Sequence, residues 1–383
     1  MSASACEVLV VGCGPAGAAA AIELATAGLR VTVLEKSSFD RRRIGETLAP
    51  DVSPWLARLR VMDRIRRIDG IDSPGVVSSW GGRTTVETDF FFNPYGSGRH
   101  IVRKQFDEVM AGAASEAGAR VVLAATVHAI SRDENGWLVH ARLRGKYTQL
   151  RATWLVDATG RRASLVRQLH GRPAAQDRLV AIVATVTNAG REDRLSIEAA
   201  ANGWWYFAPL PHQKAIVAFL TDGDLLGESR NRHSSFELSR SSTRLMRRLC
   251  LGSAERLITC DASMRWSGKV AGTGWIATGD AAISLDPLSG CGIWRALESG
   301  CFAAQTIRRA NDGDVSALPE YQDRMQTQFA TQLAQQLGIY ALVPDWSDEI
   351  FWSRRATDLS VPSNPGRGRL AATVEAGEHG EHA

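Results

Sequence analysis

The chain opens with two short apolar runs on either side of a stretch of small residues. Residues 7–11 and 30–34 have the length and composition of buried parallel strands. Residues 18–27 are mostly alanine, which favours a helix, and Gly28 follows as a typical helix end. The order strand, helix, strand predicts a βαβ unit and therefore a parallel sheet.

Three later stretches have strand-like patterns and suggest a second sheet. They cover residues 84–92, 179–186 and 214–221. They lie in two segments, 73–99 and 176–265, which we expect to be inserted into the first domain as an antiparallel, substrate-binding sheet. The first domain is then discontinuous, and its three parts are residues 1–72, 100–175 and 266–312.

Helical patterns dominate the remainder of the chain. Residues 234–250 predict a basic helix with a solvated face, and residues 293–310 predict another helix. A C-terminal helical segment is expected over 313–361, where residues 318–342 place one apolar stripe on a helix. The stripe consists of Met325, Phe329, Leu333 and Leu337. Residues 362–383 are rich in glycine, proline and charge, which predicts a disordered tail.

Composition narrows the possible functions. A chain of 383 residues can form two domains. Its net charge of +4 is slight and no basic stripe is interleaved with aromatic residues, so we expect no nucleic-acid partner. No apolar run reaches the about 20 residues of a membrane span. The six cysteines show no CxxC pair and no metal-ligand spacing, so we expect no metal site, free thiols and a cytoplasmic location. Only residues 1–6 precede the first predicted strand, so we expect no signal peptide.

A glycine motif follows the first predicted strand. Gly12 permits a tight turn, Gly14 lets the backbone approach a pyrophosphate, and Gly17 allows close packing of helix and strand. Glu35 ends the second strand, where a carboxylate can accept both ribose hydroxyls of an adenosine. The motif predicts a dinucleotide site but does not separate FAD from NAD. Its predicted cofactor-binding residues are Gly12, Gly14, Pro15, Ala16, Gly17, Glu35 and Lys36.

Two segments in the middle of the chain add candidate cofactor contacts. Arg103 stands just before a predicted helix at residues 108–117, from which its guanidinium could reach phosphates or ribose. A buried strand then runs into the turn Asp157-Ala-Thr-Gly160. Backbone at Gly160 could lie close to a ligand, and Asp157 could fix the loop through hydrogen bonds.

The segment at residues 274–292 is the most specific of the later motifs. Asp280 follows a strand, where its carboxylate can accept hydrogen bonds from a polyol, and Pro287 rigidifies the next loop. Gly290 and Gly292 leave N–H groups free at a helix N-terminus, which would stabilise negative charge. The predicted cofactor-binding residues here are Gly279, Asp280, Pro287, Gly290, Cys291 and Gly292.

Together these motifs resemble flavoprotein monooxygenases of the para-hydroxybenzoate hydroxylase fold. The resemblance covers residues 7–310. It implies an α/β fold, with a Rossmann-like FAD-binding domain of the GR2 type, an inserted antiparallel substrate sheet and C-terminal helices. It also implies non-covalent FAD, with Glu35 at the adenine ribose, Asp280 at the ribityl chain and the helix from Gly292 at the pyrimidine end of the flavin.

Two further stretches resemble particular branches of that family. The sequence RIGET at 43–47 resembles a loop beside the flavin ring in flavin-dependent halogenases and geranylgeranyl reductases. Arg43 is therefore a predicted cofactor contact and Glu46 a predicted catalytic residue. The sequence GWWYFAP at 203–209 resembles their aromatic strand above the flavin. Trp204 and Tyr206 share one strand face, so both are predicted to line the substrate cavity, the alternative being an aromatic core strand.

The lysine content separates these branches. The resemblance implies that a halogenase would have a lysine in the segment after that glutamate, and this chain has none between Lys36 and Lys104. RIGETLAP, WWYFAPLP and DPLSGCG together most resemble flavoproteins that hydroxylate a tryptophan side chain of another polypeptide on the way to cysteine tryptophylquinone.

The resemblance also implies a reaction. Reduced FAD would react with O₂ to a C4a-hydroperoxide and hydroxylate an electron-rich ring, with electrons from NAD(P)H or a separate reductase. The expected partner is a polypeptide subunit of a quinone-cofactor enzyme, or a small aromatic. Other candidates are a hydroxylase or halogenase of a small aromatic, a prenyl reductase, and a flavin-carrying maturation chaperone without enzymatic activity.

Overall fold

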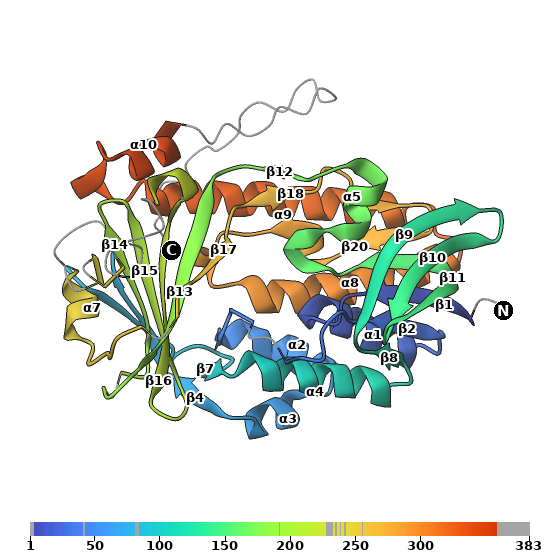
Figure 1. The fold of residues 1–383 in the computed structure, drawn as a ribbon, viewed down its shortest axis with the longest axis horizontal. Helices are drawn as coiled ribbons and strands as arrows, with labels where there is room; N and C mark the ends of the chain where they lie inside the picture. The colour runs from blue at the N-terminus through green and yellow to red at the C-terminus, as the bar shows by residue number, and fades with distance from the viewer. Residues whose placement is uncertain are drawn as a thin grey trace, which may run out of the picture.

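The computed structural model describes residues 4–40, 43–80, 84–190, 192–226, 233, 236–237, 239–240, 243–254 and 256–357. It contains two large sheets that lie at opposite ends of the molecule, with helices along the lower and upper sides (Figure 1). The predicted tail at 362–383 lies outside the described residues, as does part of the predicted helix at 234–250. The described part of that segment includes the short helix α7 (Arg244–Arg248).

The first sheet confirms the predicted α/β fold. Its strands β1, β2, β8, β11 and β20 run parallel, and β1 lies at the centre between β2 and β11. Helix α1 (Pro15–Thr26) connects β1 to β2 as the βαβ pattern predicts, and α4 (Arg103–Glu116) leads to β8. The strands are β1 (Ser4–Val11), β2 (Val31–Leu34), β8 (Arg120–Val122), β9 (Ala125–Asp133), β10 (Gly136–Leu143), β11 (Lys146–Asp157), β19 (Ala271–Gly272) and β20 (Trp275–Ala277).

The second sheet has seven strands in the order β17-β13-β16-β15-β14-β5-β6. Its pairs are antiparallel as predicted, except that β14 and β5 run parallel. β5 ends at Ser79 and β14 begins at Leu195, so no tight turn joins them and forces them to be antiparallel. The strands are β5 (Gly75–Ser79), β6 (Val86–Asp89), β13 (Leu179–Thr187), β14 (Leu195–Ala200), β15 (Gly203–Leu210), β16 (Lys214–Asp222) and β17 (Ile258–Asp261).

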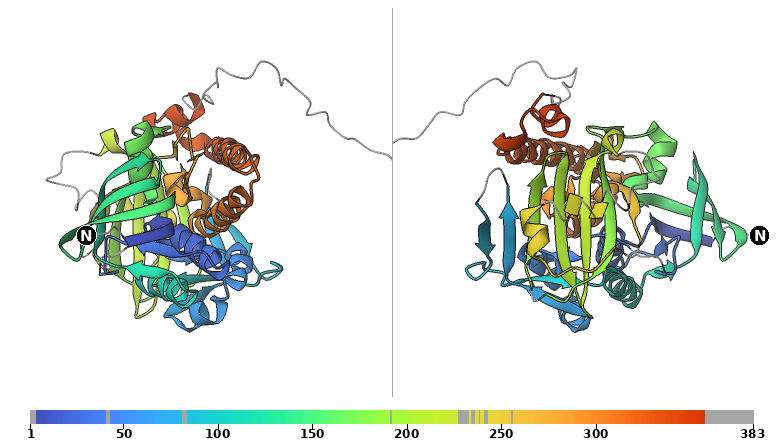
Figure 2. Two further views of the ribbon diagram at one scale, coloured as in Figure 1. Left: turned by 90° about the vertical axis from the view of Figure 1, so that its right-hand side faces the viewer. Right: turned by 60° about the vertical axis from the view of Figure 1, so that its left-hand side comes forward.

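Two small three-stranded sheets connect the large ones. One contains β3 (Thr47–Leu48), β7 (Gly98–Ile101) and β4 (Gly70–Ser73). The other contains β12 (Ala174–Ala175), β18 (Arg265–Trp266) and β21 (Ile283–Ser284). The short helices α2 (Ser53–Arg58), α3 (Met62–Arg67) and α5 (Ser164–His170) pack into the same hydrophobic core as the first sheet. α7 packs on the outer face of the second sheet, where Leu245 and Met246 bury Trp205 (Figure 2, right).

The C-terminal helices run beside both large sheets. α8 (Gly292–Asn311) packs against α1, and α9 (Ala317–Tyr340) lies alongside α8 (Figures 1 and 2). In α9, Met325, Phe329 and Leu333 of the predicted stripe are buried, and Leu337 is half-buried. α10 (Ile350–Thr357) closes the described chain over the second sheet. No helix among the described residues is long and apolar enough to cross a membrane.

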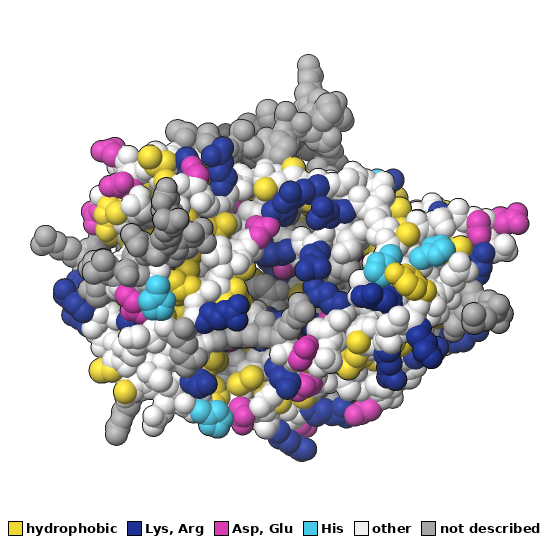
Figure 3. All heavy atoms as spheres, viewed as in Figure 1, with side chains coloured by type: hydrophobic (Ala, Val, Ile, Leu, Met, Phe, Trp, Pro, Cys, Tyr) yellow, Lys and Arg dark blue, Asp and Glu magenta, His cyan; other side chains and the backbone are white. Residues whose placement is uncertain are grey.

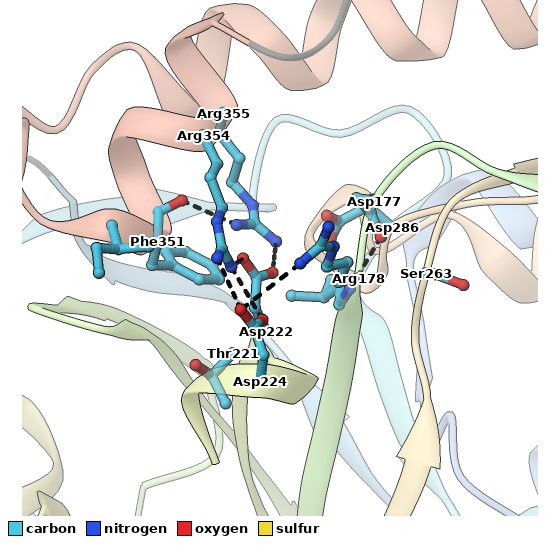
Figure 4. A network of polar contacts seen from close by, with 12 residues as sticks. Asp177, Arg178, Thr221, Asp222, Asp224, Ser263, Asp286, Phe351, Arg354 and Arg355 are labelled. Carbon is cyan, nitrogen blue, oxygen red and sulfur yellow. Dashed lines mark hydrogen bonds and ion pairs between the residues drawn. The ribbon is translucent and has the colours of Figure 1, made fainter. Parts of the chain in front are cut away.

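A network of charged side chains fixes α10 to the second sheet (Figure 4). Arg355 is buried and donates to the Asp222 carboxylate at the end of β16, with an N···O distance of 2.7 Å. Arg354 donates to Asp222 and to Asp224 at 2.9 Å each. The Arg355 guanidinium also lies 3.6 Å from the ring centroid of Phe351, so its charge is paired and covered by an aromatic face. α10 is therefore part of the hydrophobic core of the second sheet.

Replacing Arg355 by methionine is expected to lower the free energy of unfolding by about 3 kcal/mol, because the buried Asp222 loses one of its two cationic partners. Urea denaturation followed by tryptophan fluorescence measures this. Arg151→Met is the matched control, since Arg151 pairs with Asp133 on the surface and should change the unfolding free energy much less. Equal losses for the two variants would contradict the assigned role of the network.

Candidate functional site

A cavity of about 930 Å³ lies between the two large sheets. One half is bounded by the carboxyl ends of β1, β2 and β11 and by the N-termini of α1 and α8, the usual ligand position in an open α/β sheet. The inner face of the second sheet bounds the other half. Figure 3 shows Lys and Arg side chains gathered around a hollow in the middle of the molecule. The basic residues of the lining are Lys36, Arg43, Arg103, Arg161, Arg162 and Arg295.

The glycine motif forms a close-packed turn at the floor of this cavity. Gly12 has φ +103°, and a Cβ there would overlap the carbonyl oxygen of Ala158. A Cβ at Gly17 would overlap the carbonyl oxygen of Gly12, so Gly17 serves packing and is absent from the lining. Gly14, Pro15 and Ala16 do line the cavity, and α1 begins at Pro15. Free N–H groups of the first helical turn can bind a pyrophosphate at this point.

Glu35 is buried at the end of β2 beside that turn. Its Oε2 accepts a hydrogen bond from the Cys13 amide at 2.8 Å, and its Oε1 accepts three, from the Ser37 amide, the Ser37 hydroxyl and Arg43. Burial alone would raise the pKa of Glu35, but these hydrogen bonds and the Arg43 charge hold it below its usual value. With Oε1 already accepting three, Glu35 as placed can accept one ribose hydroxyl at Oε2 rather than the two expected.

Arg43 and Arg103 meet at one buried carboxylate. The Asp107 side chain is fully buried and accepts from Arg43 at 3.0 Å and from Arg103 at 3.2 Å. Arg103 also donates to the carbonyl of Ile44 at 2.7 Å. Both arginines line the cavity, yet their hydrogen bonds tie the 43–46 loop to α4. Sequence reasoning missed Asp107, although its position four residues after Arg103 on a helix was a usable signal.

Asp157 acts beneath the cavity floor. Its Oδ1 accepts from the Thr159 amide and hydroxyl, and its Oδ2 accepts from the first amides of α5, at Leu165 and Val166. Asp157 does not line the cavity, whereas Gly160 does. The side chain therefore fixes the loop as predicted, and it is the loop backbone that borders the cavity.

Asp280 borders the cavity at the end of β20. Gly279 precedes it with φ +59°, where a Cβ would come within 2.7 Å of the Ala16 side chain. Asp280 is half-exposed, and one of its oxygens lies 3.7 Å from Nε of Arg161. Arg161 also donates to the carbonyls of Ser263 and Leu285 at 2.6 and 2.7 Å. Arg161, which sequence reasoning did not single out, thus joins this strand end to the loop at 285–292.

The loop before α8 presents backbone to the cavity. Pro287, Gly290, Cys291 and Gly292 all belong to the lining, and Gly290 has φ +61°. α8 begins at Gly292, so its unpaired first N–H groups face this region. The Cys291 thiol donates to the carbonyl of Ser289 at 2.8 Å, and burial raises its pKa. A protonated, hydrogen-bonded thiol has a structural role here rather than that of a nucleophile.

Trp204 and Tyr206 share a face of β15, but only Tyr206 lines the cavity. The prediction that Trp204 does so is wrong. Its indole is fully buried and donates to the Tyr340 hydroxyl at 3.0 Å. Tyr340, at the end of α9, donates in turn to Asp286 at 2.9 Å. Helices α9 and α10 cover Trp204, and strand alternation cannot reveal such a cover.

The half of the cavity beneath the second sheet is mostly apolar. Tyr206 faces it from β15, with Glu46 and Thr47 at its base. Glu46 is buried and accepts from the Gly45 amide at 2.9 Å. The apolar lining from this sheet comprises Val76, Ala181, Val183, Leu195, Ile197, Ala218 and Leu220. A hydrophobic wall with a few polar groups at one end suits a flat aromatic ring.

Aromatic residues lie where β6 ends beside this cavity. Phe90 lines the cavity, whereas Phe91 and Phe92 are 82% and 91% exposed. Their rings contact each other edge to face, with centroids 5.0 Å apart. Tyr95 is also exposed, at 48%. Large apolar side chains exposed next to a cavity are typical of surfaces that bind another molecule.

Comparison with known proteins supports a flavin site. A family model described as an FAD binding domain matches residues 5–221. The putative FAD-dependent oxidoreductase LodB of Marinomonas mediterranea is 30% identical over 360 residues, which cover 91% of this chain and 96% of LodB. An FAD cofactor fits this site, because the glycine turn, Glu35 and the N-termini of α1 and α8 offer groups that can bind its pyrophosphate, ribose and ring.

Two solved structures share the fold. The myxobacterial chondrochloren halogenase CndH has a TM-score of 0.84 at 21% identity, over 92% of this chain and 86% of its own. The peptidyl tryptophan dihydroxylase QhpG, described as essential for tryptophylquinone cofactor biogenesis, has a TM-score of 0.75 at 24% identity. That match covers 94% of this chain and 80% of QhpG.

Gly12→Ala is expected to reduce bound FAD more than tenfold, because the new Cβ would push the glycine turn away from Ala158. The ratio of flavin absorbance to protein absorbance after purification measures the loss. Gly28→Ala is the matched control, since Gly28 also has positive φ, at +88°, but has open space around it. That variant should lose about 1–2 kcal/mol of stability and keep its flavin. Full flavin content in Gly12→Ala would show that the close approach is not needed.

Proposed function

This chain belongs to the FAD binding domain family, and from that membership we propose that it is a flavin-dependent monooxygenase acting on an electron-rich aromatic ring. The substrate we propose is a tryptophan side chain within a partner polypeptide. One observation carries the proposal: the dinucleotide site and an apolar compartment under the second sheet form a single cavity. A cofactor and an aromatic ring can therefore meet without intervening solvent.

The proposed cofactor position follows the polar groups of the cavity. The N-terminus of α1 at Gly14 would hold the pyrophosphate, Oε2 of Glu35 would accept from one adenosine ribose hydroxyl, and Asp280 would accept from the ribityl chain. The N-terminus of α8 would hold the flavin ring, where its free N–H groups would stabilise negative charge. Bound and reduced, FAD supplies the activation of O₂, with electrons from NAD(P)H or a separate reductase. The protein binds, orients and excludes water.

Three observations support a polypeptide substrate in which the target is tryptophan. An indole is electron-rich and fits a hydrophobic wall with Tyr206 at one end. The exposed Phe91 and Phe92 adjoin the cavity and provide apolar contacts for a docked chain. QhpG, which shares the fold over 94% of this chain, acts on peptidyl tryptophan by its description.

Halogenation is the second candidate, because CndH shares the fold over most of both chains. The positions of the lysines among the described residues argue against halogenation. Lys36 is the one lysine in the described cavity lining, and it stands next to Glu35 at the cofactor end rather than under the second sheet. No lysine ammonium is therefore available beside Tyr206 to handle an oxidised halide.

Incubation of the reduced holoenzyme with O₂ and tryptophan-containing subunits of candidate quinone-cofactor enzymes is expected to oxygenate one subunit. Mass spectrometry should show the mass of one or two oxygen atoms added at a tryptophan. Enzyme lacking flavin is the control. The assignment moves to a small-molecule hydroxylase if no subunit is modified while a free aromatic is turned over rapidly.

Chloride or bromide added to the same reaction is expected to enter no product, since the described residues that line the substrate half of the cavity include no lysine. Product masses with and without halide should be identical, and the halogen isotope pattern makes the measurement decisive. A chlorinated or brominated product formed by the purified enzyme would establish the halogenase function instead.

A further inference from the structure

Four polar groups from different segments form one hydrogen-bonded chain, here called the buried row, which ends at the cavity wall. Its members are Tyr206, Thr47, His100 and the backbone carbonyl of Asp193. The Tyr206 hydroxyl on β15 lies 2.8 Å from Oγ1 of Thr47 on β3. That oxygen lies 3.0 Å from Nδ1 of His100 on β7. Nε2 of His100 lies 3.0 Å from the backbone carbonyl oxygen of Asp193. Tyr206 and Thr47 line the cavity, whereas His100 is fully buried behind them.

The direction of every hydrogen bond in this row follows from its buried end. The Asp193 carbonyl can only accept, so Nε2 of His100 must carry a proton. Burial lowers the pKa of His100 to about 4, so the ring is neutral near pH 7 and Nδ1 is an acceptor. Thr47 must then donate its single hydroxyl proton to Nδ1. Its oxygen accepts from Tyr206, whose own proton therefore points away from the cavity.

The Tyr206 oxygen is consequently left with lone pairs toward the cavity. Burial and the negative charge of Glu46 raise the pKa of Tyr206 above its ordinary value, so the group remains a neutral phenol. A phenol whose proton is already donated can only accept a further hydrogen bond. The carboxylate of Glu46, next to Thr47, is an acceptor as well. At this end of the substrate half, Tyr206 and Glu46 therefore both offer hydrogen-bond acceptors.

We propose that His100 acts as a positioning residue that sets the Thr47 and Tyr206 hydroxyls, so that Tyr206 selects aromatic substrates carrying an N–H or O–H donor. This rests on the proposed function and specifies its substrate class: an indole whose ring N–H is donated to Tyr206. A ring of the same shape with an acceptor in that position would leave two lone pairs facing each other. A site built to pair with a donor rejects such an isostere strongly.

Indole and benzofuran are suitable probes because they differ only in N–H against O. Titration of the oxidised FAD holoenzyme with each compound, followed by the change in flavin absorbance, gives two dissociation constants without turnover. Indole is expected to bind about 10- to 100-fold more tightly than benzofuran. Tyr206→Phe should bring this ratio close to one.

The role of the buried row is tested separately at Thr47. Thr47→Val keeps the shape but removes the hydroxyl, so Tyr206 can turn its proton to the cavity and the ratio should fall at least fivefold, mainly through tighter benzofuran binding. Thr47→Ser restores a hydroxyl and should restore the ratio. Tyr321→Phe is the control for loss of a buried phenol elsewhere, since Tyr321 donates to the Ala277 carbonyl, and it should leave the ratio unchanged.

Equal binding of the two probes by the unmodified protein, or no binding of either, would overturn the proposal. If Thr47→Val left the indole-to-benzofuran binding ratio unchanged, His100 and Thr47 would have no positioning role for Tyr206. Because the readout is binding, it is independent of oxygenation. A large binding ratio, together with no oxygenated product in the assays of the reduced enzyme described above, would leave the donor selection intact and refute the monooxygenase assignment.

Discussion

The spacing between the two large sheets depends on the polar contacts of the C-terminal helices. Tyr340 bonds on one side to Trp204 of the second sheet and on the other to Asp286 in the loop before α8. Arg355 holds the same helical region to Asp222 at the end of β16. Burial raises the pKa of Asp286 to about 6, so this carboxylate is kept buried at a cost that its hydrogen bonds offset. These contacts join the second sheet to the loop before α8, which forms part of the cavity wall.

Several charged side chains in or beside the cavity also hold backbone and other charges in place. Asp107 gathers Arg43 and Arg103, Asp157 organises the 159–166 loop, and Arg161 holds two carbonyls while approaching Asp280. Each carboxylate or guanidinium makes several hydrogen bonds, as buried charges must. The groups left for a ligand are therefore mostly helix N-termini and loop amides, which suit the phosphates and ring of a dinucleotide.

Local sequence signals predicted the local structure well. The βαβ unit with its glycine turn and the buried stripe of α9 depend on spacing within one segment, and the structure confirms both. Contacts between distant segments were not accessible in this way. Trp204 is covered by Tyr340, 136 residues further along the chain, and the parallel pairing of β14 with β5 joins strands that lie far apart in the sequence. The number of hydrogen bonds that Glu35 accepts could not be predicted either, because one of them comes from Arg43 in a neighbouring loop.

The position of β20 has a consequence for the order in which the protein can fold. The glycine turn is closed by Ala158, which contacts Gly12, and by Gly279, which contacts Ala16. Gly279 follows β20, and β20 pairs with β11 only after about 120 intervening residues have been made. Pairing β20 with β11 closes this long loop, and the loss of chain entropy makes early pairing unfavourable. During synthesis, the amino-terminal βαβ unit is therefore complete before the segments that close its cofactor site have been made. We therefore expect flavin binding to follow the synthesis of α8 and its packing on α1.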